Sequence, residues 1–196
     1  MVVDRFTWLK INAVGRILDV GSAGAHTFGG RAVNLDLDLY HVPNFVRGDA
    51  HNLPFVDNSF DTVCLGDVLE HVDDPLRVLL EAKRVAKLIL ITVPDEKDRY
   101  LERMMSEVYE SDDPELHRKA VEKWIRDNRP VEIIDDKKRP HLFHRRFFTE
   151  QELIDLLEKA GLEYEIQHVD YGIYRGWYIK AWRKEDAQKK EQGSEG

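Results

Sequence analysis

Three short apolar runs constrain the fold of this chain more than any other feature. Residues 16–20 (RILDV), 60–66 (FDTVCLG) and 87–93 (KLILITV) are β-rich and nearly continuous in hydrophobicity, which is typical of strands buried on both faces of a parallel sheet. Residues 73–86 (DDPLRVLLEAKRVA) lie between the last two, with Pro75 in the first turn and apolar residues at helical spacing. Strand, helix and strand in this order predict a right-handed βαβ unit.

The remaining elements extend this unit in both directions along the chain. The segments RAVNLDL and NFVRGD provide two more candidate strands. Thr149 and Glu152 have the spacing of a capping box at the start of a helix, and Gly161 is expected to end that helix. Residues 163–169 and 171–182 are β-rich, so we expect them to pair antiparallel at the sheet edge.

Two segments depart from this regular pattern. Residues 95–140 contain two polar, amphipathic stretches, 99–110 and 114–128, which we interpret as a helical insertion or lid over the acceptor site. Residues 184–196 are charged and contain no aromatic residue, so this tail is expected to be disordered. The prediction is one domain over residues 1–183, since 196 residues fit one ordinary α/β domain.

Composition limits the partners and the compartment. The net charge of -8 disfavours the broad positive surface that binds duplex nucleic acid, and no apolar stretch approaches the roughly 20 residues that span a bilayer. The first residues lack the apolar run of a signal peptide. Cys64 is the single cysteine and lies in an apolar run, so we expect a buried strand position in a cytoplasmic protein.

The segment ILDVGSAGAHTFGG (17–30) is the first candidate binding element. A strand containing Asp19 is followed by small residues, and a short helix is expected after them. Small residues let a ligand approach the backbone, and N–H groups at a helix start favour a carboxylate or phosphate. The turn alone suits adenosylmethionine, a dinucleotide or simple strand-to-helix packing.

Two further acids suit a nucleoside laid across the strand ends. Asp36 ends the next candidate strand and could accept hydrogen bonds from both ribose hydroxyls, with Asp38 as the competing assignment. Asp49 follows the strand after that. Its carboxylate could accept a hydrogen bond from an adenine amino group, or it could simply form the turn after Gly48.

With these motifs, residues 14–169 resemble the class I S-adenosylmethionine-dependent methyltransferases, especially the type 11 family. The matching motifs are LDVGSAGA, NLDL, GDAHNLPFVDNSFD, GDVLEHVDDPLRVLLEAKRVAK and HRRFFTEQELIDLLEKAGLE. The resemblance implies an α/β, Rossmann-like fold. Its sheet would be seven-stranded and mostly parallel, with an antiparallel C-terminal edge hairpin and a helical insertion.

The resemblance also implies a place for the methionine part of the cofactor. Gly21 and the backbone of Ser22 and Ala23 would cradle it, and Asp19 would orient the turn or the bound amino group. The family usually has glycines where Ala23 and Ala25 stand here. This departure points to weaker binding or to a non-catalytic binding module, because a methyl group can obstruct close approach.

Roles for the nucleoside and the reacting methyl group follow from the same resemblance. Asp36 would hold the ribose, Asp49 would meet the adenine amino group, and the backbone of Ala50 would meet the ring. Gly66 and Asp67 would flank the donor beside the fourth strand.

The predicted reaction is methyl transfer from S-adenosylmethionine to a small-molecule, lipid or saccharide acceptor, with S-adenosylhomocysteine as the product. If the acceptor loses a proton, His71 is the first candidate base, ahead of His141 and His144. No metal is expected. The basic stretch 137–148 (KKRPHLFHRRFF) could grip an acidic acceptor or be a solvated, salt-bridged connector that neutralises Asp135 and Asp136. The alternatives are a non-catalytic nucleoside-cofactor-binding module and an NAD-dependent oxidoreductase or epimerase.

Overall fold

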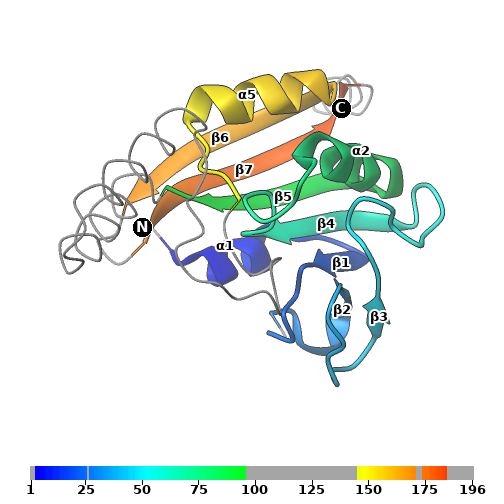
Figure 1. Cartoon of the computed structure of the whole chain (residues 1–196). Coiled ribbons are helices and arrows are strands. Elements are labelled where there is room, and N and C mark those ends of the chain that lie inside the picture. Colours follow the sequence, from blue (N-terminus) through cyan, green and yellow to red (C-terminus); the bar gives the residue numbers. More distant parts are fainter. Residues whose placement is uncertain (1–2, 26, 96–144, 171–173, 185–196) are drawn as a thin grey trace, which may run out of the picture.

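A seven-stranded sheet forms the centre of the computed structural model, which describes residues 3–25, 27–95, 145–170 and 174–184 (Figure 1). The strand order is β3-β2-β1-β4-β5-β7-β6. The strands are β1 Ile17–Val20, β2 Ala32–Asp36, β3 Phe45–Arg47, β4 Phe60–Gly66, β5 Ala86–Pro94, β6 Leu162–Asp170 and β7 Arg175–Arg183. The first five are parallel, whereas β7 runs antiparallel to both β5 and β6. The predicted fold class is confirmed, with β6 at the edge and β7 inside the sheet.

The helices begin and end where their capping residues stand. In α2, Pro75–Val85, the N-cap Asp74 accepts a hydrogen bond from the backbone N–H of Arg77. In α5, Glu150–Lys159, Thr149 and Glu152 form the predicted capping box, which satisfies backbone donors at the helix start. Gly161 follows with a φ of 66°, a left-handed conformation that favours glycine after a helix.

Helices cover both faces of the sheet. Figure 1 shows α2 and α5 on one face and α1, Arg5–Asn12, on the other. The larger core lies beneath α2 and α5, where Leu79, Ala82 and Leu157 are buried against the strands. The smaller core lies beneath α1, where Leu9 packs in a cluster that includes Cys64. The central strands β1, β4 and β5 are therefore buried on both faces, as their nearly continuous apolar sequences require.

The short helix expected after β1 is not an α-helix in the described residues. The described residues there form turns and a three-residue 3-10 turn, Gly29–Arg31. Gly21, Gly24 and Gly29 all have positive φ angles between 60° and 69°, which an α-helix does not allow. The glycines therefore produce a tight loop, and its described residues, 21–25 and 27–31, present no α-helix start to a ligand.

Several predictions fall outside the described residues. These are residues 96–140 of the helical insertion, residues 185–196 of the tail, and the alternative bases His141 and His144. The helix α1 was not predicted at all. Among the helices that the structure describes, none is long and apolar enough to cross a membrane.

Candidate functional site

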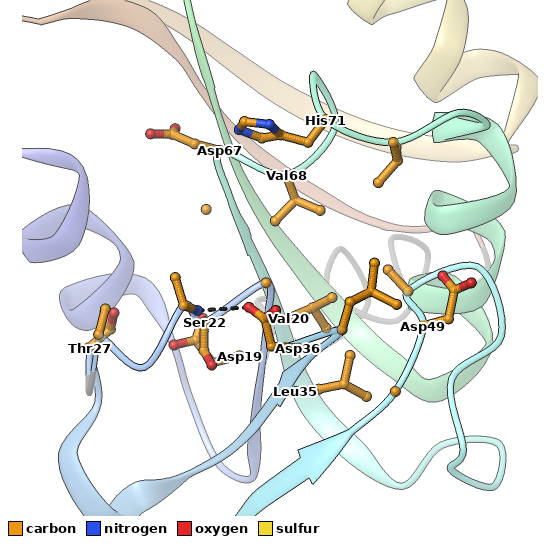
Figure 2. Close-up of a pocket in the computed structure, with 18 of the residues that line it drawn as sticks. Asp19, Val20, Ser22, Thr27, Leu35, Asp36, Asp49, Asp67, Val68 and His71 are labelled. Carbon is orange, nitrogen blue, oxygen red and sulfur yellow. Dashed lines mark hydrogen bonds between the residues drawn. The ribbon is translucent and has the colours of Figure 1, made fainter. Parts of the chain in front are cut away.

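A cavity of about 420 Å³ opens at the ends of β1, β2 and β4 (Figure 2). The residues predicted as first choices for the site all line it: Asp19, Gly21, Ser22, Ala23, Asp36, Asp49, Ala50, Gly66, Asp67 and His71. The carboxyl ends of parallel strands meet at one edge of a sheet, which explains why residues so far apart in the chain converge. The structure brings these residues together, whereas their individual roles stay predictions.

The turn after β1 contains two glycines at positions where a larger side chain would clash with neighbouring residues. Gly21 has a φ of 68°, and a Cβ there would lie 2.7 Å from Cγ2 of Val68. Gly24 has a φ of 69°, and a Cβ there would lie 2.9 Å from the ring of Tyr40. Both positions therefore require glycine. Gly24 is thus used for a close approach even though it is out of phase with the family pattern.

The two alanines of the turn differ in conformation. Ala23 has a φ of 45°, in the left-handed region, whereas Ala25 is not among the described residues with positive φ. The backbone N–H of Ala23 donates to Oδ2 of Asp36 at 2.9 Å. Of the two departures from the family pattern, only Ala23 occupies a conformation that favours glycine.

Asp36 ends β2 and points into the cavity (Figure 2). Its Oδ1 accepts the backbone N–H of Asp38 at 3.0 Å, and its Oδ2 accepts that of Ala23. A carboxylate has about four lone-pair sites, so it can still accept hydrogen bonds from a diol. The strand stops at Asp36, and Asp38 is not among the residues that line the cavity. The geometry favours Asp36 over Asp38 as the ribose residue.

Asp19 is buried beneath the turn, with 4% of its surface exposed. Burial raises its pKa to about 7, the nearby charge of Asp36 adds to the rise, and a hydrogen bond with Thr27 opposes it. Within the described part of the chain, Oδ2 of Asp19 and Oγ of Ser22 are buried without hydrogen-bond partners. Buried polar groups normally have partners, so these two atoms fit an ammonium-bearing group such as the amino acid end of adenosylmethionine.

Asp49 and Ala50 follow β3 on another wall of the cavity. Oδ1 of Asp49 accepts the backbone N–H of His51 at 2.9 Å and lies 2.7 Å from Nδ1 of its ring. Partial burial raises the pKa of Asp49, but the hydrogen bonds and charge of His51 outweigh it, so the pKa is lowered overall. Asp49 therefore forms the expected turn while it also faces the cavity.

The third wall begins where β4 ends at Gly66. Asp67 follows with a φ of 54°, a left-handed conformation that asparagine and aspartate adopt more readily than most residues. Its Oδ1 accepts hydrogen bonds from Oγ1 of Thr92 at 2.7 Å and from the hydroxyl of Tyr174 at 3.3 Å. Its Oδ2 lies 2.9 Å from Nε of Arg5. Residues from three separate segments of the chain therefore hold this one carboxylate in place.

Sequence reasoning missed Arg5 and Tyr174. Arg5 lies on α1 and lines the cavity, and its guanidinium lies 5.3 Å from the ring centre of Tyr174. The only local sign in the sequence is Asp4, which caps α1 by accepting the backbone N–H of Thr7. A capping residue can predict a helix start, but it does not predict which distant carboxylate the helix will contact.

His71 lines the cavity near Asp67 (Figure 2). Its backbone N–H donates to the carbonyl of Val68 at 3.0 Å. Arg145 lines the same region and pairs with Asp73, and Arg146 donates to the carbonyl oxygen of Asp73 at 2.7 Å. The part of the basic stretch that the structure describes is thus bound to the segment before α2, whereas Asp135 and Asp136, which the connector interpretation pairs with this stretch, lie outside the described residues.

The sheet order, its antiparallel strand β7 and the acid-lined cavity at the strand ends together define the class I methyltransferase fold. The family model described as "Methyltransferase domain" matches residues 19–88. The predicted type 11 methyltransferase domain is confirmed for that part of the chain, which contains the glycine turn and the three acidic strand ends.

Curated relatives match less than half of the chain. The chain is 34% identical over 104 residues to a demethylmenaquinone methyltransferase of Renibacterium salmoninarum, covering 42% of this chain and 44% of that protein. It is 39% identical over 67 residues to the protein of the same name from Thermotoga maritima, covering 32% and 29%. The chain therefore spans less than half the length of these relatives.

Solved structures match over nearly the whole chain. A methyltransferase of Thermotoga maritima, described as a possible histamine N-methyltransferase, has a TM-score of 0.59 at 22% identity and covers 91% of this chain and 87% of its own. A methyltransferase of Methanosarcina mazei has a TM-score of 0.60 at 18% identity, with coverages of 93% and 99%. Magnesium protoporphyrin IX methyltransferase of Synechocystis, solved with bound S-adenosylhomocysteine, has a TM-score of 0.56 at 14% identity, with coverages of 91% and 80%. These similarities show the fold.

Proposed function

We propose that this chain binds S-adenosylmethionine in the cavity and transfers its methyl group to a small-molecule acceptor. The observation that carries this proposal is the convergence of three carboxylates, Asp19, Asp36 and Asp49, on one cavity at the ends of successive strands. The cofactor has a cationic amino acid end, a ribose diol and an adenine amino group, each of which can donate hydrogen bonds. The three acids provide an acceptor for each of these groups.

We assign each part of the cofactor to particular residues of the cavity walls. Asp19 and Ser22 have the unused buried polar atoms and would hold the amino acid end with the backbone of Gly21 and Ala23. Asp36 would accept the ribose hydroxyls. When bound, the sulfonium supplies a methyl group that is already activated for displacement.

The nucleoside and donor ends involve the remaining predicted residues. Asp49 would accept the adenine amino group, and the backbone of Ala50 would contact the ring. Gly66 and Asp67 would flank the donor. Asp67 is held by three partners, so it offers a fixed carboxylate at that end and needs no reorganisation as the acceptor approaches.

Alignment of the acceptor with the methyl group does much of the work in an in-line displacement, so a dedicated base is not always needed. Where the acceptor must lose a proton, we propose His71 as the base, because it lines the cavity near Asp67. A His71→Asn variant would then retain cofactor binding but have a lower kcat. The decrease in kcat should be largest at pH values below the pKa of the acceptor group.

The nature of the acceptor is the finer part of the proposal. The relatives named demethylmenaquinone methyltransferase favour a small molecule, and lipids and saccharides stay within the proposed range. The net charge of -8 disfavours nucleic acid. We also propose a cytoplasmic location, on the basis of the single buried cysteine.

Calorimetric titration with S-adenosylmethionine and, separately, with NAD tests the proposal. We expect saturable binding of S-adenosylmethionine only. Asp36→Ala should abolish that binding, whereas the matched control Asp38→Ala should retain it, because Asp38 contributes its backbone N–H to Asp36. Binding of NAD alone would favour an oxidoreductase. Binding of S-adenosylmethionine without transfer to a broad acceptor panel would favour a non-catalytic module.

A further inference from the structure

His51 joins the candidate adenine carboxylate to the start of α2. Its ring Nδ1 lies 2.7 Å from Oδ1 of Asp49, and its ring Nε2 accepts the backbone N–H of Asp74 at 3.3 Å. Its own carbonyl oxygen accepts Nε of Arg77 at 3.0 Å. Backbone and side chain of one residue therefore connect the loop after β3 to the N-cap and first turn of α2.

These contacts fix the tautomer of the His51 ring. A neutral imidazole has one N–H donor and one acceptor nitrogen. Because Nε2 accepts from Asp74, the proton lies on Nδ1, which donates to Oδ1 of Asp49. The backbone N–H of His51 donates to the same oxygen at 2.9 Å. Oδ1 of Asp49 is thus occupied twice, whereas no described residue donates to Oδ2.

The rest of this loop is held rigidly against α2. Oε2 of the buried Glu81 accepts the backbone N–H of Leu53 at 2.9 Å. Arg84 donates to the carbonyl oxygens of Leu53 at 3.0 Å and Phe55 at 2.7 Å. The loop therefore has a fixed base, and His51 is the residue that transmits this fixed position to the Asp49 carboxylate.

We propose that His51 is a positioning residue for the cofactor adenine. It holds Asp49 in one orientation, with Oδ1 engaged and Oδ2 available to accept a hydrogen bond from the adenine 6-amino group. The inference rests on the proposed function, since it requires a cofactor that contains adenine. It predicts that His51 contributes to recognition of the amino group itself and not only to folding of the loop.

A pair of ligands separates these two contributions. S-adenosylhomocysteine and its purine analogue, in which hydrogen replaces the 6-amino group, are titrated calorimetrically into the wild-type protein and the variants His51→Ala and His51→Asn. The wild-type protein should prefer S-adenosylhomocysteine by about tenfold or more, as expected for a hydrogen bond to a charged acceptor. His41→Ala is the matched control, because His41 is exposed and lies outside the cavity lining.

His51→Ala should reduce that preference to about twofold or less by weakening S-adenosylhomocysteine while leaving the analogue nearly unchanged. His51→Asn should retain most of the preference, since its amide N–H lies where Nδ1 donates. The control should retain all of it. If His51→Ala does not fold, His51→Gln gives the same comparison, because its longer amide reaches the position of Nε2.

Other outcomes would overturn the inference. Equal weakening of both ligands in the variant would mean that His51 has a purely structural role. An unchanged preference in His51→Ala, or no preference in the wild-type protein, would mean that His51 does not act through the amino group. Failure of the wild-type protein to bind either ligand would refute the proposed function as well, so the two failures are distinguishable.

Discussion

The backbone N–H of Ala23 donates to Oδ2 of Asp36 at 2.9 Å, which ties the turn after β1 to the end of β2. Ala23 has a φ of 45°, a conformation that costs a residue with a Cβ roughly 1–2 kcal/mol. The hydrogen bond to a carboxylate offsets part of that cost. The candidate ribose residue therefore also stabilises the turn at the position where the family usually has glycine.

Replacing Ala23 with glycine should stabilise the protein. Glycine adopts a positive φ without steric cost, and its greater freedom in the unfolded chain opposes only part of the gain. We expect Ala23→Gly to raise the free energy of unfolding by about 1 kcal/mol, measured by urea denaturation. Ala25→Gly is the control and should lower it by up to about 1 kcal/mol. Equal effects at the two positions would contradict this explanation.

Gly176 should not tolerate a side chain, because the backbone of Val93 and the side chain of Tyr174 both lie too close to it. A Cβ at Gly176 would lie 2.5 Å from the carbonyl oxygen of Val93 and 2.7 Å from the hydroxyl oxygen of Tyr174. We expect Gly176→Ala to lower the free energy of unfolding by about 2 kcal/mol, as overpacking does. It should also displace the Tyr174 hydroxyl from Asp67, which lies 3.3 Å away.

The control for this substitution is Gly30→Ala. A Cβ at Gly30 would meet nothing within 4 Å, and its φ is not in the left-handed region. The free energy of unfolding should therefore change by less than about 1 kcal/mol. Thermal denaturation of the two variants measures the difference. A Gly176→Ala protein as stable as Gly30→Ala would show that β7 shifts to accept the methyl group.

The sequence predicts those parts of the fold that local patterns determine. The strand predicted at residues 60–66 matches β4, Phe60–Gly66, because a strand buried on both faces forms one apolar run. The capping box of Thr149 and Glu152 is equally local. The acidic strand ends were found because parallel strands carry their carboxyl ends to one edge.

The parts that were missed depend on contacts between distant residues. Helix α1 buries Leu9 as its one fully enclosed residue, so its sequence has little apolar periodicity. The contacts of Arg5 and Tyr174 with Asp67 join residues far apart in the chain. The short helix expected after β1 shows a different limit, because the run of small residues does not reveal that several glycines there adopt positive φ.

Glu81 should stabilise the protein above, but not below, the pH at which it titrates. Hydrogen bonds from Arg84 lower its pKa more than burial raises it, with further lowering by the backbone N–H of Leu53. The ordinary pKa of a glutamate such as Glu81 in the unfolded chain is 4.5. The contribution of Glu81 to the free energy of unfolding is therefore fully present above that pH. It is lost as the pH falls through the lower value of the folded state.

We expect Glu81→Gln to lower the free energy of unfolding by about 2 kcal/mol at pH 7, because it leaves Arg84 without its buried partner. The difference from the wild-type protein should shrink below pH 4. Asp57→Asn is the control: Asp57 pairs with the same Arg84, but its side chain is 69% exposed. Its effect should stay under about 1 kcal/mol. Urea denaturation across this pH range measures both, and a pH-independent effect of Glu81→Gln would contradict the argument.

Asp19 should make the pH dependence of stability run in the opposite direction to that of Glu81. Its pKa is about 7 in the folded protein and 3.8 without burial. Between these values the folded state binds more protons than the unfolded state, so the contribution of Asp19 to stability falls as the pH rises from about 4 to 7. Asp19→Asn cannot ionise and should lack this decline. Its advantage over the wild-type protein should grow across that window towards a few kcal/mol, as measured by urea denaturation.

The same group should link cofactor binding to proton release. An ammonium group placed beside Asp19 favours the ionised carboxylate and lowers its pKa, so S-adenosylmethionine binding near pH 6 should expel a proton. Titration calorimetry in two buffers of different ionisation enthalpy measures this release, which should approach one proton per site and vanish above pH 8. Asp19→Asn should release none. Proton release that persists in this variant would mean that a different group titrates, and equal heats in both buffers for the wild-type protein would mean that the amino group does not lie beside Asp19.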